Sequence, residues 1–296
     1  MTNVFRHAAW VESSESLLTL LDPICGLVPF GIVLPGAMPP PGGLVHVHCR
    51  AVTVVCPPDK AEAKRPCCER TRVYLLEGPG TNLDSKSWGN PPDERIMIEH
   101  VERLTRLLPD EGKDFLFRSN RVRQCKDGGG LLDELEGRAA GSLTALSEVL
   151  TQGGFQDDRK LRDACRGLHG FGCGLTPTGD DLLVAVAACC RRLAGNRVEK
   201  DGVWTVEMDT VFRKCLSELP REGTTKAGSE MLSWAARGFF AEPLADLMKR
   251  IGAARLRPDE LERLAGRLLR TGGRSGRDMM CGLILFLREF LRVRKQ

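Results

Sequence analysis

Aromatic side chains are scarce in this 296-residue chain, and neither sign of charge dominates it. Phe, Trp and Tyr make up 5% of the residues, with a single tyrosine, and 43 basic residues face 39 acidic ones. Single-stranded nucleic acids are held by stacking on aromatic rings, and duplexes by an excess of positive charge. The composition therefore argues against a nucleic-acid-binding protein.

The sequence also lacks an unbroken apolar run of the length that spans a bilayer. The uncharged stretch 23–49 is interrupted by six prolines and several glycines, which do not allow one continuous apolar helix. The first residues do not follow the basic–apolar–small order of a secretory signal. From these patterns we expect a soluble, cytoplasmic protein without a membrane-bound segment.

Twelve cysteines are present, but no Cys-x-x-Cys motif. We expect reduced thiols, with Cys189, Cys190 and Cys281 acting as small core residues inside apolar helical runs. His46 and His48 would share one face of a strand, but no further ligands stand at zinc spacing. The sequence therefore predicts no metal site at these residues.

Hydrophobic patterning changes along the chain and predicts an α+β protein. Short β-branched runs bounded by Pro and Gly, such as 44–55, predict strands in the N-terminal part. The polar, glycine-rich stretch 126–130 is the best boundary candidate, and almost everything beyond it has helical spacing. We thus expect a β-rich mixed domain over 1–125 and an all-helical domain over 126–296.

The densest motif is the run 169–181, His-Gly-Phe-Gly-Cys-Gly-Leu-Thr-Pro-Thr-Gly-Asp-Asp. Its glycines allow a close backbone approach to a ligand, and an apolar helix follows. A glycine-rich loop at a helix N-terminus is suited to binding an anion, because free N–H groups and the helix dipole point outward. Asp180 and Asp181 leave a second possibility open, namely a bound divalent cation.

A second loop repeats part of this pattern. Thr178-Gly179-Asp180-Asp181 and Ser275-Gly276-Arg277-Asp278 share the order hydroxyl–Gly–x–Asp, and each opens an apolar helix. A pair of capping boxes would explain the hydroxyl and the acid three residues later, but not the glycine run of the first loop. If both helices start on one side of a bundle, their N-termini would converge on one anionic ligand.

A third polar, glycine-bearing loop covers 221–229 and also precedes a helix. It does not have the full phosphate-loop pattern, so a surface loop is the favoured interpretation of this stretch taken alone. Taken with the other two loops, it predicts a convergent pocket. His169 adjoins the first loop and has the only catalytic neighbourhood among the histidines, where it would act as an acid or base. A histidine that only stabilises the end of a helix through the helix dipole is an equally good interpretation.

The first motif resembles the signature of a bacterial family related to AllH, a subunit of oxamate carbamoyltransferase, which acts in anaerobic allantoin degradation. The resemblance continues through Thr224-Thr225-x-x-x-Ser229, the run 238–244 and the run 273–279. Two departures are Cys173, where the family carries proline, and Gly273-Arg274, where members often carry His-Thr.

The resemblance implies a transferase subunit, working with other protein subunits, that moves a carbamoyl group between phosphate and an amide such as oxamate. The alternative is a non-catalytic anion-sensing or scaffolding subunit. No cofactor is implied with certainty, and a divalent cation at Asp180 and Asp181 stays the open possibility. The expected catalytic residues are Asp180, Asp181 and His169. The expected residues for a small anionic substrate are Gly172, Gly174, Thr176, Thr178, Gly179, Thr224, Thr225, Lys226, Arg274, Ser275, Gly276 and Asp278.

Overall fold

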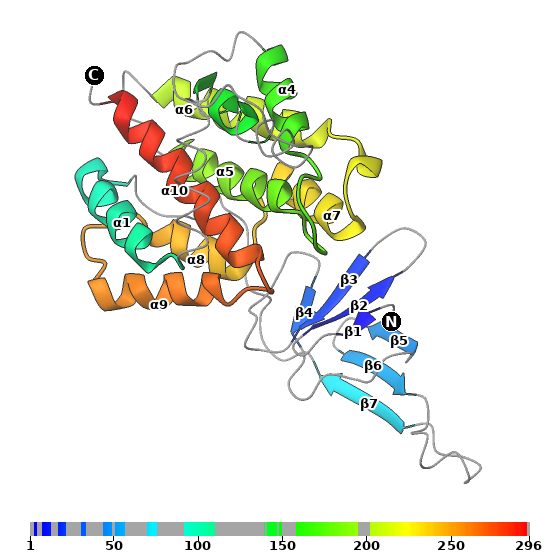
Figure 1. The fold of residues 1–296 in the computed structure, drawn as a ribbon. Helices are drawn as coiled ribbons and strands as arrows, with labels where there is room; N and C mark the ends of the chain where they lie inside the picture. The colour runs from blue at the N-terminus through cyan, green and yellow to red at the C-terminus, as the bar shows by residue number, and fades with distance from the viewer. Residues whose placement is uncertain are drawn as a thin grey trace. The chain divides into compact units, whose positions relative to one another are not determined.

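The protein is described from a computed structural model (Figure 1). Side chains are described for residues 92–109, 139, 141–146, 148–149, 159–194 and 207–292. Over residues 1–75 the structure gives the backbone of seven strands. By its internal contacts the chain divides into two compact units, 1–82 and 83–296. The predicted domain boundary at 125/126 lies outside the residues described with side chains. His46 and His48, at which no metal site is predicted, also lie outside them.

The strands of the first unit form two sheets. In the first, β1 (Asn3–Val4), β2 (Ala8–Glu12) and β3 (Leu17–Leu21) pair antiparallel, and β4 (Gly31–Val33) pairs parallel with β3. In the second, β5 (Leu44–His48), β6 (Ala51–Cys56) and β7 (Arg70–Leu75) form an antiparallel meander, with Leu44 opposite Val55 and Ala51 opposite Leu75.

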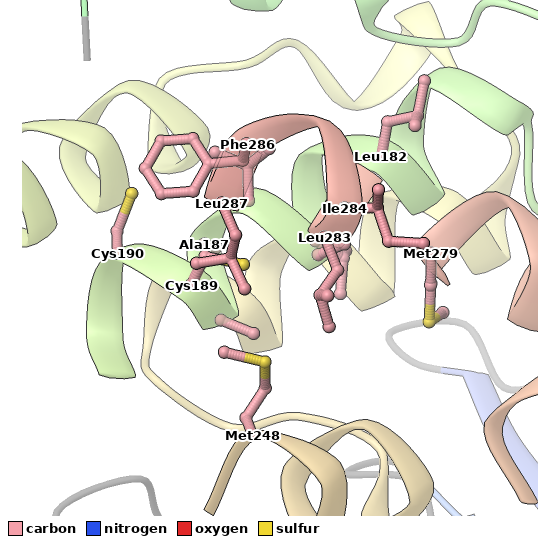
Figure 2. Close-up of a cluster of buried hydrophobic side chains, with 14 of the residues drawn as sticks. Leu182, Ala187, Cys189, Cys190, Met248, Met279, Leu283, Ile284, Phe286 and Leu287 are labelled. Carbon is pink, nitrogen blue, oxygen red and sulfur yellow. The ribbon is translucent and has the colours of Figure 1, made fainter. Parts of the chain in front are cut away.

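The second unit is built around two long helices, α5 (Thr178–Ala194) and α10 (Ser275–Arg294), which lie side by side (Figure 1). Their close approach is explained by Gly282, where an added Cβ would lie 3.2 Å from that of Ala185. Figure 2 shows the apolar side chains that these helices share, including Leu182 from α5 and Leu283 from α10. Nearly every residue of α5 is buried, so α5 is the central helix of this unit.

Shorter helices surround this pair: α1 (Glu94–Leu107), α4 (Asp158–Leu168), α6 (Gly202–Ser217), the 3₁₀ turn η4 (Arg221–Gly223), α7 (Lys226–Ala236), α8 (Glu242–Arg250) and α9 (Pro258–Leu269). Helices α4, α6, α7 and α8 pack on α5, while α1 and α9 pack on α10. None of the helices in the described ranges combines the length and apolar character that a bilayer crossing requires.

The predicted α+β class is wrong for the residues described with their side chains, of which 77% are helical and none lies in a strand. Helix α1 shows the reason. The sequence pattern over 96–108 predicted a helix but assigned it to the mixed N-terminal domain, whereas its buried residues Met97, Val101 and Leu104 face α9 and α10. Its apolar stripe therefore belongs to the helical core.

The predicted role of three cysteines is confirmed. Cys189, Cys190 and Cys281 are buried, free thiols within the core. Burial raises the pKa of the Cys189 thiol, and it raises that of Cys281 to about 12. Both remain protonated and act as small apolar side chains.

Candidate functional site

The loop between α4 and α5 depends on glycine at three positions. Gly170, Gly172 and Gly174 have φ values of 70°, 101° and 120°, in the left-handed region that other residues rarely adopt. Gly170 also lies against the backbone of the third loop, since an added Cβ would be 2.0 Å from the carbonyl oxygen of Gly223. The glycines thus let two loops touch through their main chains.

Asp180, in the first turn of α5, is completely buried. One carboxylate oxygen accepts a hydrogen bond of 2.9 Å from the Gly170 N–H, and the other accepts one from the Thr224 hydroxyl. Burial raises the pKa of Asp180, and the two hydrogen bonds and nearby His169 partly offset that rise. Asp180 therefore holds the first and third loops together beneath the surface.

Asp181, the next residue, is also completely buried but binds different partners. It accepts a hydrogen bond of 2.6 Å from the Ser275 hydroxyl and one of 3.2 Å from the Thr176 hydroxyl. Burial raises the pKa of this carboxyl well above its ordinary range, and Asp278 adds to the effect. The two adjacent aspartates thus connect the first loop to two different neighbours.

The first and second loops are joined by two reciprocal hydrogen bonds. Thr178 donates to Asp278 over 2.8 Å, while Ser275 donates to Asp181, so each loop's hydroxyl binds the other loop's acid. Arg277 also contacts Asp278, with Nε 3.3 Å from the carboxylate. The hydroxyl and the acid at each helix start therefore pair between α5 and α10.

The two helix starts also share a backbone arrangement. The Gly179 N–H donates to the Phe171 carbonyl, and the Gly276 N–H donates to the Thr271 carbonyl, at 2.8 and 2.9 Å. An added Cβ would lie 1.7 Å from the Leu168 carbonyl oxygen at Gly179 and 1.8 Å from the Leu268 oxygen at Gly276. The shared hydroxyl–Gly–x–Asp motif thus places a glycine at the start of each helix, α5 and α10, in close contact with the end of the helix before it.

The third loop joins the cluster through two threonines. Thr225 caps α7 by accepting the Gly228 N–H over 3.0 Å, and its hydroxyl donates to the Leu175 carbonyl over 2.5 Å. Gly228 is required here, because an added Cβ would lie 2.2 Å from an oxygen of Asp180. Lys226 stands exposed at the first position of α7. The starts of α5, α7 and α10 therefore lie together, as the three sequence motifs suggested.

An exposed rim borders this buried cluster. Gly172, Cys173, Gly174 and Leu175 are all exposed, as is Arg274 of the second loop. An Arg274 guanidinium nitrogen lies 3.8 Å from the Cys173 sulfur. This contact joins the exposed parts of the first and second loops.

His169 lies at the other side of the first loop. Its ring packs on Gly223, where an added Cβ would be 2.5 Å from Cε1. It also lines a cavity of about 490 Å³ between α6 and α7, together with Arg213, Lys214 and Arg237. These three cations were missed by sequence reasoning. Arg213 and Lys214 belong to an amphipathic helix, where charges at such spacing are common.

The carboxylates do not assemble into a metal site. Within the residues that the structure describes, no group of three or more His, Cys, Asp or Glu side chains lies together in a way that would hold a metal ion. Asp180 and Asp181 instead accept hydrogen bonds from loop hydroxyls and a backbone N–H. In the structure these two carboxylates hold the loops in position.

Comparison with known proteins gives one match. Residues 168–287, which are 120 of the 296, match the family model described as oxamate carbamoyltransferase subunit AllH. The matched range contains all three loops and every residue of the hydrogen-bonded cluster. No curated protein and no solved structure matches the chain.

Proposed function

We propose that the protein is a subunit of a carbamoyltransferase-like enzyme and works with other protein subunits, because residues 168–287 match the family model of the AllH subunit. Its small anionic ligand would be carbamoyl phosphate, phosphate or a carboxylate such as oxamate. The ligand would bind at the exposed rim of the three-loop cluster.

The observation that carries this proposal is the convergence of the three loops. Residues far apart in sequence are joined by hydrogen bonds from Thr178 to Asp278, from Ser275 to Asp181 and from Thr224 to Asp180. Three helix N-termini are thereby gathered, and each carries a partial positive charge. The buried acids oppose that charge, but their raised pKa values favour the neutral form.

The arrangement divides the predicted site residues into two roles. The exposed residues Gly172, Gly174, Lys226 and Arg274 are proposed to contact the anion through N–H groups and positive charge. The buried and half-buried residues are proposed to position them: Thr176, Thr178, Gly179, Asp180, Asp181, Thr224, Thr225, Ser275, Gly276 and Asp278. His169 is the proposed acid or base. Carbamoyl transfer needs positioning and charge stabilisation more than a covalent nucleophile.

The test is phosphate-dependent cleavage of oxalurate by the protein mixed with its partner subunits. Arg274→Ala should lower kcat/KM by about tenfold or more, because a charge on the bound anion loses its partner. The matched control is Arg263→Ala, which removes an equally exposed arginine from α9. Equal activity of both variants would contradict the assignment of the rim.

The second candidate, an anion-sensing or scaffolding subunit, is favoured by a different observation. The hydroxyls of Thr176, Thr178, Thr224 and Ser275 all donate to carboxylates within the cluster, as a purely structural junction would require. Thermal unfolding with carbamoyl phosphate, phosphate or oxamate separates a scaffold from a subunit that binds an anion, and the oxalurate assay then separates sensing from catalysis. A bound substrate raises Tm, whereas a scaffold without a site is unaffected by all three.

A further inference from the structure

The cavity between α6 and α7 that His169 lines is separate from the exposed rim of the loops. Its volume is about 490 Å³, within the range of small-molecule sites. Its lining includes Pro220 and Arg221 of the turn after α6, and His169. The facing walls are helical stripes: Thr210, Arg213, Lys214 and Ser217 from α6, and Ser229, Ser233, Ala236 and Arg237 from α7.

The charge of this lining is one-sided. Four cations line the cavity, Arg213, Lys214, Arg221 and Arg237, and none of its lining residues is acidic. One of these cations, Arg213, is paired with the buried Asp209 at 3.3 Å, and Asp209 also pairs with Arg191 at 3.0 Å. One carboxylate shared between two arginines does not neutralise four cations, so the cavity keeps a net positive charge.

Two of the four cations are held in place. The Arg213 guanidinium contacts Asp209 and donates to the Ala236 carbonyl over 3.4 Å. The Arg237 guanidinium lies 3.8 Å from the Trp234 ring centroid, and its Nε donates to the Ser233 carbonyl over 3.2 Å. These contacts orient both side chains before any ligand arrives, which lowers the entropy cost of binding.

The other two cations that line the cavity are Lys214 and Arg221. Among the residues described with their side chains, Lys214 and Arg221 form no ion pair, and both are exposed. Like charges left close together repel, and an anion bound between them would relieve that repulsion. Hydroxyls of Ser229 and Ser233 on the opposite wall would add hydrogen bonds to its oxygens.

We propose that the cavity between α6 and α7 is a binding site for a small polyanion that carries two or more phosphate groups. A single orthophosphate reaches only part of a cavity of this size, whereas two linked phosphates engage the fixed and the free cations together. Arginine binds phosphate oxygens with two parallel hydrogen bonds, which suits this lining. The site goes beyond the proposed transferase function and adjoins it at His169.

The test is calorimetric titration of the full-length protein with inorganic pyrophosphate and, separately, with orthophosphate. Pyrophosphate should bind about tenfold or more tightly than orthophosphate, and its affinity should fall as salt is raised. The double variant Lys214→Ala/Arg221→Ala should raise the pyrophosphate Kd by about tenfold. Both residues are exposed, so the variant should keep the wild-type Tm without ligand.

The matched control is Arg255→Ala/Arg263→Ala, which removes the same net charge from exposed positions outside the cavity. It should leave the pyrophosphate Kd within twofold of wild type. Equal loss of affinity in both double variants, or no binding of pyrophosphate by the wild-type protein, would overturn the proposal. Arg274→Ala separates this site from the rim, because it should impair oxalurate cleavage and leave the pyrophosphate Kd unchanged.

Discussion

The loops that precede α5 and α10 share a helix-start geometry but differ in length and charge. From the carbonyl of Phe171 to the N–H of Gly179 the chain takes eight residue steps, whereas from Thr271 to Gly276 it takes five. The longer loop contains the exposed run 172–175, and its Asp180 stands where the shorter loop has Arg277.

This difference separates what the two loops share as structure from what distinguishes the first. The shared parts are the glycine under the preceding helix end and the exchanged hydroxyl–carboxylate pairs. The parts that distinguish the first loop are its greater length and the buried contact of Asp180 with the third loop. We associate the features that only the first loop has with ligand binding.

The largest expected effect tests the shared glycine. Gly179→Ala and Gly276→Ala should each lower the free energy of unfolding by about 3 kcal/mol or more, because the new methyl group meets a backbone carbonyl that cannot move aside. Urea unfolding measures both. Gly273→Ala is the control, since an added Cβ there has no heavy atom within 4 Å. A small effect at Gly276 alone would show that the two starts are not equivalent.

The next largest effect is the pH dependence of folding stability that buried Asp181 causes. The raised pKa of Asp181 means that the folded protein binds its proton more tightly than the unfolded chain does. Stability should therefore fall as pH rises from the ordinary pKa of 3.8 through the raised value, by up to about 1.4 kcal/mol per pH unit. Asp181→Asn should flatten this decline.

Denaturant unfolding at several pH values measures this difference. The exposed Asp163→Asn is the control, and it should retain the wild-type pH dependence. If Asp181→Asn follows the same curve as wild type, Asp181 does not carry the linkage.

A smaller effect compares the exchanged hydroxyls. Ser275→Ala should cost about 2 kcal/mol and Thr178→Ala about 1 kcal/mol, because Asp181 is fully buried, whereas Asp278 keeps a contact with Arg277. Chemical denaturation of the two single variants and the double variant measures both costs and their coupling. A larger loss at Thr178 would reverse the proposed order of the two bonds.

The smallest stability effect is expected at the rim. Arg274→Ala should change the free energy of unfolding by less than about 0.5 kcal/mol, since the side chain is exposed and its described contact is the Cys173 sulfur. The same variant should lower oxalurate cleavage, as proposed above. A large loss of stability instead would make Arg274 a structural residue of the junction.

Much of this site could be predicted from local patterns. The glycines of the first loop, the hydroxyl–Gly–x–Asp echo and the apolar run after each predicted a pair of loops that open helices. The AllH-like resemblance of this region is confirmed by the family match over 168–287. The partners of each hydroxyl could not be predicted, because a capping box and a cross-helix pair use the same residues at the same spacing.

Other features were beyond local patterns. The cavity between α6 and α7 draws its cations from both helices and the following turn, and each cation alone is typical of a solvent-exposed helix face. The membership of α1 in the helical core likewise depends on contacts with α9 and α10, which lie more than 150 residues away along the chain.

The sequence by itself determined the places where helices begin, because glycine, hydroxyl and acid act within a few residues of each other. It also determined the buried character of α5, since an almost wholly apolar run cannot face water. Only the tertiary structure decided that Ser275 binds Asp181 and that Thr178 binds Asp278. Hydrogen bonds between distant segments depend on how α5 and α10 cross, and that crossing is set by packing around Ala185 and Gly282.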